Sequence, residues 1–484
     1  MFRYQSKLSS SRLDSTGTKP QLKVRAKDSK QKCATKIWST LHRPRPNRLS
    51  ETDGGEQQLI VYQQSTFVAT LLFLLMYSGP PKFRIRDAEA SLRGDVDWVV
   101  VLHIFVWGLA GAWVLFQIGK RGRAKLLLTR LQLPQKLGLA MILCLAVSAV
   151  IAKAPALSAF KIYEMAVSLL FMQLFADQFG HSNCLKTIFW GTALLCGVIA
   201  VCAYLAPDLV WIGSDFNPDP SRLKGDLIAP TGPVSTLAII LLLTGVRKIW
   251  RVLPLTLLGL FFGLLVFSLM RTAYVVVIGF FVLVLIKRPN AKSLRQVAYL
   301  AGALALALYM YHWLPSLSQY RQPEDIANLG DRLGLWRYLS NVTLTQSPFL
   351  GLGYYSASRV YGPQYNPGLG NAHSMFFEIL LGGGALSFAL FAALCVMLSV
   401  YSAYLLRKNR DRFSFAIACL FFVSLIFGSM GDEIDSGPVA MCFWYSATVL
   451  PRLYDRSSMR AAQSDRSRRR LLVMMGALKK SEAP

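Results

Sequence analysis

The side chains with the clearest potential for chemistry are a histidine and several cations that flank long apolar runs. His373 is one of five histidines, and it stands where residues 312–372, a mostly polar segment, give way to an apolar run. A neutral imidazole accepts a proton near neutral pH, which is the chemistry that activates a hydroxyl group. His373 is therefore a candidate general base. The alternative interpretation is a histidine that caps a helix start or makes a local hydrogen bond there.

Four cations lie on separate segments of the chain that border apolar runs, and we expect them on the same side of a membrane. They are Lys161, Arg222, Arg271 and Arg332. A guanidinium group binds phosphate through two parallel hydrogen bonds. Segments that meet at one face would bring these cations to one anion-binding site. For Lys161 the alternative is that the long side chain carries its ammonium to the surface without a binding role.

Residues 312–372 are also rich in aromatic side chains, and Trp336 is the candidate for substrate contact among them. Aromatic faces stack on sugar rings, whereas tryptophan and tyrosine also gather at membrane interfaces without binding anything specific. Both interpretations remain open for this segment.

The elements that must position these residues are membrane-spanning helices. Hydrophobic residues make up 53% of the 484-residue chain and charged residues 16%, against roughly a quarter in soluble domains. Apolar runs of about 18 residues cross a bilayer as helices, because lipid offers no hydrogen-bond partner to the backbone. The predicted fold class is all-α, a polytopic helical membrane protein with about 12 transmembrane helices. The predicted spans are 59–77, 98–118, 137–152, 159–179, 188–205, 233–246, two within 252–286, 297–311, 373–406, 413–430 and 439–450. The glycine triplet 382–384 is expected to break or bend the span 373–406.

The net charge of +27 fixes the predicted topology. Basic residues crowd residues 1–58, the tail 453–484 and alternate short loops, which is the pattern of cytoplasmic segments in a bacterial inner membrane. We therefore expect a disordered basic cytoplasmic arm at 1–58, a membrane domain at 59–452 with a large periplasmic loop at 312–372, and a basic cytoplasmic tail. Both termini are then cytoplasmic. Nucleic-acid binding by the arm is the disfavoured alternative, since anionic lipid headgroups attract the same charges.

The run 252–286 decides the register of the later helices. As one helix it would measure roughly 52 Å, which exceeds the thickness of a bilayer core. Both of its flanks are basic, so both are expected in the cytoplasm. The sequence thus predicts a tightly paired helical hairpin with Arg271 at its external tip.

Several segments resemble the O-antigen ligase and O-antigen polymerase family. Residues 331–336 (DRLGLW), followed by 347–354 (SPFLGLGY), are similar to its arginine–tryptophan and N-P-L-L-G-x-G signature. Residues 371–380 (NAHSMFFEIL) are similar to its histidine segment, 222–230 to a loop that begins with arginine, and 270–273 (MRTA) to an arginine at a helix end. The matches cluster between residues 220 and 385.

The resemblance implies transfer of a glycan from an undecaprenyl-diphosphate carrier to a sugar hydroxyl at the periplasmic face, without a metal or other cofactor. Arg271 and Arg332 would hold the diphosphate, Arg222 would assist, and His373 would act as general base. Glu378 lies about 140° around a helix from His373, so we expect it to orient the site or to support a helix turn instead of pairing directly with the imidazole. The partners implied are the carrier-linked glycan, a growing polysaccharide or lipid acceptor, membrane lipids and other polysaccharide-assembly proteins, but no nucleic acid.

Two alternatives stay open at this point. Within the enzyme class, a polymerase of exopolysaccharide or O-antigen repeat units is preferred to a ligase that joins the glycan to lipid A core or another acceptor. A transporter or flippase of a glycolipid is the alternative from another class. Transporters commonly show internal repeats and charges at the midplane, and neither is evident in this sequence.

Overall fold

The computed structural model describes residues 54–78, 97–120, 131–212, 222–224, 228–244, 253–287, 332–366, 371–408, 411–431 and 434–481. The chain divides into two compact units, Met1–Tyr62 and Gln63–Pro484. The fold described here is that of the second unit. The predicted cytoplasmic arm and the predicted span 297–311 lie outside the described residues, apart from the start of the first helix within the arm.

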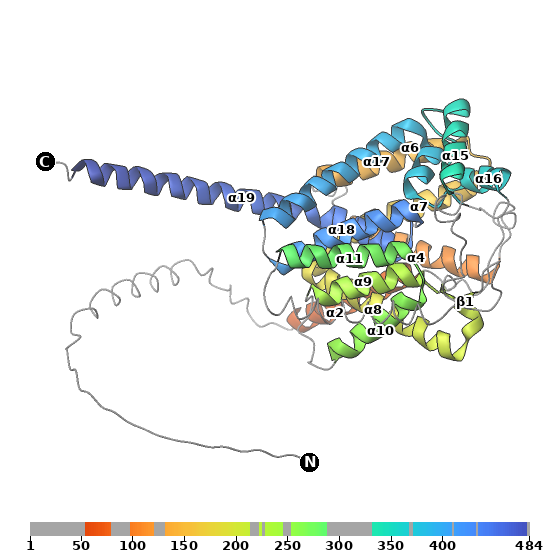
Figure 1. Ribbon diagram of the computed structural model, residues 1–484, viewed down its shortest axis with the longest axis horizontal. Helices are drawn as coiled ribbons and strands as arrows, with labels where there is room; N and C mark the ends of the chain where they lie inside the picture. The colour runs from red at the N-terminus through yellow and green to blue at the C-terminus, as the bar shows by residue number, and fades with distance from the viewer. Residues whose placement is uncertain are drawn as a thin grey trace, which may run out of the picture. The chain divides into compact units, whose positions relative to one another are not determined.

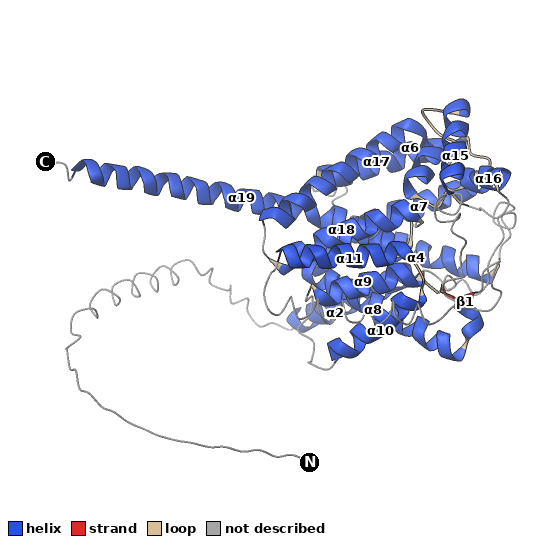
Figure 2. Ribbon diagram, viewed as in Figure 1, coloured by secondary structure: helices blue, strands red, loops and turns tan. Residues whose placement is uncertain are grey.

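Helices account for nearly all of the described structure, which confirms the all-α prediction (Figures 1 and 2). In the described ranges, six helices are long and apolar enough to cross a membrane: α4 (Trp98–Lys120), α6 (Leu133–Val150), α7 (Pro155–Phe179), α8 (His181–Leu205), α17 (Met375–Lys408) and α18 (Arg412–Met430). Shorter apolar helices are found in α2 (Gly54–Ser78), α9 (Thr231–Leu243) and α10 (Leu253–Phe267). The protein is thus a multi-pass membrane protein.

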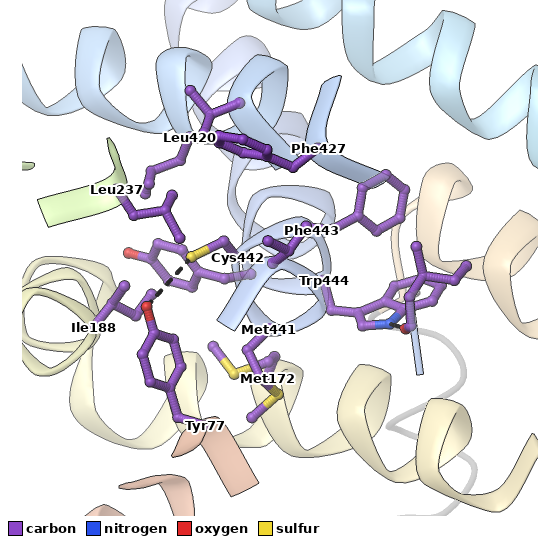
Figure 3. Packing of buried hydrophobic residues seen from close by; sticks show 14 of the residues in the cluster. Tyr77, Met172, Ile188, Leu237, Leu420, Phe427, Met441, Cys442, Phe443 and Trp444 are labelled. Atoms are coloured by element: carbon purple, nitrogen blue, oxygen red, sulfur yellow. Dashed lines mark hydrogen bonds between the residues drawn. The ribbon is translucent and has the colours of Figure 1, made fainter. Parts of the chain in front are cut away.

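The centre of the bundle is formed by α9 and the first turns of α19 (Gly437–Ser481), whose side chains are buried on nearly every side. Helix α19 packs against α6, α7, α17 and α18. Tyr77 reaches this core from α2, where its hydroxyl lies 4.0 Å from Cys442 Sγ (Figure 3). The same hydroxyl lies 2.6 Å from Thr192 Oγ1. Helices that are apolar all round are buried by their neighbours, as the composition of α9 requires.

The hairpin predicted at 252–286 is present, with α10 followed by α11 (Arg271–Lys287) and a turn at Ser268–Met270. The expectation that its two helices are tightly paired is wrong. Helix α10 packs mainly against α8 and α9, whereas α11 packs against α9 and α18. The reason is that α9, which is apolar and buried on nearly all faces, packs against both helices of the hairpin.

The segment predicted as a large loop contains two helices, α15 (Arg332–Gln346) and α16 (Ser356–Tyr365), which pack against α17 at one end of the bundle (Figure 1). Helix α17 is interrupted at Gly384, whose φ of 63° and ψ of −165° break the helical ladder. The predicted bend at the glycine triplet 382–384 is therefore present. The carbonyls that lose their helical partners at this bend accept hydrogen bonds from the chain between α15 and α16. Leu352 N donates to Leu381 O (2.8 Å), and Gly353 N donates to Gly382 O (3.0 Å).

Two features differ from the sequence-based expectation, one helix boundary and one pair of strands. The last predicted span, 439–450, was expected to end before a basic tail, yet α19 continues as helix to Ser481. The residues beyond Leu450 are polar but rich in good helix formers, so the loss of hydrophobicity ends the apolar stretch without ending the helix. A short antiparallel pair, β1 (Trp211–Ile212) and β2 (Arg222–Leu223), lies in the segment between α8 and α9, with Trp211 opposite Leu223.

Candidate active site

The segments that carry the candidate residues meet at one end of the helix bundle. A guanidinium nitrogen of Arg332, the first residue of α15, donates to the carbonyl of Met430 at the end of α18. Arg222 in β2 donates from Nε to the carbonyl of Ser268 in the α10–α11 turn (2.8 Å). Two predicted cations are thus fixed to the ends of two different helices by backbone carbonyls. The predicted topology likewise expects these helix ends on one face of the membrane.

His373 lies two residues before α17. Its φ of 50° is a backbone conformation that residues other than glycine rarely adopt. Its backbone N–H donates to Asn371 Oδ1 (3.1 Å), so a local Asx turn supports this geometry. Burial is the main cause that lowers the pKa of His373 to about 4, followed by the positive charges of Arg332, Arg359 and Lys224. The imidazole is consequently neutral at physiological pH and able to accept a proton.

The three cations that act on His373 come from three different segments. Arg332 is on α15, Arg359 is on α16, and Lys224 directly follows β2. The Lys224 backbone is anchored on both sides: its N–H donates to Val210 O (2.9 Å) and its carbonyl accepts from Thr231 N (3.1 Å). A half-buried, neutral histidine with three cations acting on it places a proton acceptor beside positive charge, which is the arrangement that suits an anionic substrate group.

Arg271 and Arg222 form a second part of this end of the bundle. Arg271 is the exposed first residue of α11, and Arg222 contacts the turn that precedes it. Leu269 in that turn has a φ of 50°, which closes the hairpin in three residues. Lys224, two residues after Arg222, is one of the cations that act on His373 and so connects this part to the histidine.

Trp336 and Glu378 hold the peptide that precedes His373. Trp336 Nε1 donates to the Ala372 carbonyl (2.7 Å), and the indole stacks on Phe377 with ring centres 4.8 Å apart. Glu378 Oε1 accepts from the Ala372 N–H (2.9 Å) and lies 3.9 Å from Arg359 Nη1. The Glu378 carboxylate thus contacts the backbone beside His373, and its role in orienting the site stays a prediction.

Lys161 occupies a different environment from the one expected of a substrate-binding or surface-seeking lysine. Its ammonium lies 2.8 Å from Glu164 Oε2 and 2.7 Å from Asp435 Oδ2, and its side chain is 13% exposed. Both carboxylates are fully buried. Lys161 therefore compensates two buried negative charges, and the sequence had offered no sign of this because Asp435 is 274 residues away.

Sequence reasoning did not select three residues that the structure places here: Lys224, Arg359 and Tyr355. Tyr355 has a φ of 65°, so Leu269, Tyr355 and His373 are the described non-glycine residues with positive φ, and all three border this site. Strained backbone of this kind gathers at functional sites, where the surrounding structure maintains it. Arg359 and Tyr355 stood in the arginine- and aromatic-rich segment, and Lys224 stood in the Arg222 loop, which were the available signals.

Fold and site together define a multi-pass membrane protein with a cationic site around a neutral histidine. Residues 256–392 match the family model described as O-antigen ligase, and the match confirms the resemblance to that family. The matched range contains Arg271, Arg332, Arg359 and His373, so the family domain supplies most of the site. The match indicates glycan transfer of the O-antigen ligase or polymerase type in the membrane. No curated protein matches the chain.

Within the described ranges, no group of three or more His, Cys, Asp or Glu side chains is arranged to hold a metal ion.

Proposed function

We propose that this protein transfers a glycan from an undecaprenyl-diphosphate carrier to a sugar hydroxyl at the periplasmic face of the bacterial inner membrane. The observation that carries the proposal is the neutral, half-buried His373, on which three cations act from α15, from α16 and from the residue that follows β2. Such a site pairs a proton acceptor with positive charge that stabilises an anionic leaving group.

In the proposed reaction, the imidazole of His373 takes the proton of the acceptor hydroxyl as the hydroxyl oxygen attacks the anomeric carbon. The bond between that carbon and the diphosphate oxygen breaks, and undecaprenyl diphosphate leaves with its negative charge. Arg332 and Arg271 hold the diphosphate, with Arg222 assisting, and Arg359 and Lys224 add positive charge beside His373. Attack from the face opposite the leaving group inverts the anomeric centre.

Binding of the diphosphate donor raises the pKa of His373 and so makes the imidazole a better base. A general base works best when its pKa is near the working pH, and a value of about 4 is low for that task. A bound diphosphate neutralises the cations that depress this pKa, so the pKa rises when the donor is present. The imidazole then accepts the acceptor's proton more readily in the donor complex than in the free protein.

Among the glycan-transfer reactions we propose polymerisation of exopolysaccharide or O-antigen repeat units. The support for this choice is the modest length of the predicted external segment 312–372, whose sequence shows no obvious extra platform for a lipid A core. Gene deletion followed by size analysis of the surface glycan separates the two reactions. A polymerase leaves single repeat units, whereas a ligase leaves long chains on the carrier lipid.

The proposal is tested with purified protein in liposomes that contain lipid-linked oligosaccharide. His373→Ala and Arg271→Ala abolish transfer while expression and membrane insertion stay normal. Near-full activity of His373→Ala would overturn the assignment of the base. A glycolipid that crosses the liposome membrane without chemical change would instead indicate a flippase.

A further inference from the structure

A buried group of charged residues lies on α7 beside the site, and the proposed reaction does not use it. Lys161 joins Glu164 and Asp435, at 2.8 and 2.7 Å, and His103 Nε2 contacts the other oxygen of Glu164. Glu164 and Asp435 are fully buried, and Asp435 comes from the short connection between α18 and α19. The group thus joins α7, the α18–α19 connection and, through the contact of His103 with Glu164, α4. Charged groups buried in this way keep a fixed position. If one of them moved away, its partners would remain buried without an opposite charge, which is costly.

The same ammonium group contacts the site through an aromatic ring. Lys161 Nζ lies 4.7 Å from the centre of the Tyr355 ring, and Arg359 Cζ lies 3.8 Å from the centre of the same ring. Two cations thus rest on one π system, where each is attracted by the ring although the two repel each other. The backbone of Tyr355 is itself fixed between Gly353 and Ser356, whose hydroxyl lies 2.8 Å from Ser158 on α7.

Arg359 is connected to the peptide before His373 through Glu378. Its Nη1 lies 3.9 Å from Glu378 Oε1, and that oxygen accepts the N–H of Ala372, the residue before His373. The positive charge of Arg359 also acts on the His373 ring. The structure therefore contains a continuous series of contacts from the buried Lys161 through Tyr355, Arg359 and Glu378 to the candidate base.

We propose that Lys161 and Tyr355 are positioning residues: the buried ammonium fixes the Tyr355 ring, and the ring fixes Arg359 beside Glu378 and His373. The proposal rests on the proposed function for its catalytic meaning, but the arrangement itself is testable without catalysis. It gives Lys161 a role that does not involve substrate contact. It also explains why a strained tyrosine occupies this turn, since the contact of its ring with both cations depends on that backbone conformation.

The test measures the proton affinity of His373, which depends on how close the positive charge of Arg359 lies to the imidazole. The charged groups that face His373 are Lys224, Arg332, Arg359 and, through the adjacent peptide, Glu378. Protein labelled with carbon-13 at the histidine ring is titrated by NMR in nanodiscs, and the His373 signal is assigned by its loss in His373→Gln.

Tyr355→Leu removes the ring without a change of charge, and Tyr355→Phe keeps the ring as the matched control on the same strained backbone. We expect Tyr355→Leu to raise the proton affinity of His373 by about threefold or more, because the guanidinium is no longer held in place. Tyr355→Phe titrates like the wild type. Equal titration of the Leu variant and the wild type would overturn the proposal.

The lysine is tested by a double substitution, since Lys161→Met alone leaves two buried carboxylates uncompensated and threatens folding. Lys161→Met with Asp435→Asn removes one positive and one negative charge together. We expect this variant to fold and to shift His373 as Tyr355→Leu does, with no further shift when the two are combined. Additive shifts would contradict a single series of contacts. If these shifts occur while the wild type transfers no glycan, the positioning stands and the proposed function fails.

Discussion

The pH dependence of transfer is the prediction that follows most directly from the environment of His373. Burial and the charges of Arg332, Arg359 and Lys224 hold the pKa of His373 at about 4, against an ordinary value of 6.5. The difference corresponds to about 3 kcal/mol in favour of the neutral imidazole. A base that must be neutral therefore stays active in acid, where an ordinary histidine would be protonated.

The size of the effect is large enough for a simple rate comparison. At pH 5.5 an imidazole with a pKa of 4 is almost entirely neutral, whereas one with a pKa of 6.5 is about one-tenth neutral. We expect kcat/KM at pH 5.5 to remain within about twofold of its value at pH 7.5, because kcat/KM reports the free protein. The acid limb of kcat lies at higher pH than that of kcat/KM, because the bound diphosphate neutralises the cations.

The assay is initial-rate transfer in liposomes with a lipid-linked oligosaccharide donor, across pH 4 to 8. Arg359→Gln moves the acid limb of kcat/KM upward, and Arg337→Gln is the matched control. Arg337 is an exposed arginine on α15 that is not among the charges acting on His373. A limb of kcat/KM near pH 6.5 in the wild type, or equal behaviour of the two variants, would refute this account of the site.

Three further predictions concern the structure around the base. Trp336→Phe loses the hydrogen bond to the carbonyl before His373 and lowers kcat by about fivefold, as kinetics in liposomes will show; an unchanged kcat would contradict the positioning role. Gly382→Ala places a Cβ 2.5 Å from the Tyr354 Cα and lowers the free energy of unfolding by about 1–3 kcal/mol. Gly279→Ala is the control, because there is open space around Gly279 and its Tm should not fall. Equal Tm values of the two variants in detergent would count against the packing described. The unfolded protein binds a proton at His373 below pH 6.5 and the folded protein only below about 4, so stability falls by up to about 3 kcal/mol as pH decreases through this window. Comparing Tm at pH 7.5 and 4.5 for wild type and His373→Gln tests this, since the variant should lose less.

The sequence predicted those parts of the fold that depend on length, hydrophobicity and charge placement. The hairpin at Arg271 followed from a run too long for one helix, and the turn before α11 lies where the argument required it. The bend in α17 followed from three successive glycines, one of which has a φ of 63°. These features are local, so composition alone specifies them.

Features that depend on distant contacts were beyond sequence reasoning. The pairing of Lys161 with Asp435 joins residues far apart in the chain, and only packing of α7 against the α18–α19 connection brings them together. Arg359 was one of several arginines in its segment, and nothing in its spacing separated it from Arg337. Helices α15 and α16 carry too little hydrophobicity to be recognised as elements of a membrane protein by the length of an apolar run.

The central claim is that His373 is the base for glycan transfer from a lipid diphosphate, and one measurement tests it most directly. Purified wild-type protein and His373→Gln are reconstituted with undecaprenyl-diphosphate-linked repeat units, and extended glycan and released undecaprenyl diphosphate are both quantified. We predict one carrier released for each bond formed by the wild type, and a rate at least about 100-fold lower for His373→Gln at equal protein and equal Tm. Extension of the glycan by His373→Gln at near the wild-type rate would contradict the account.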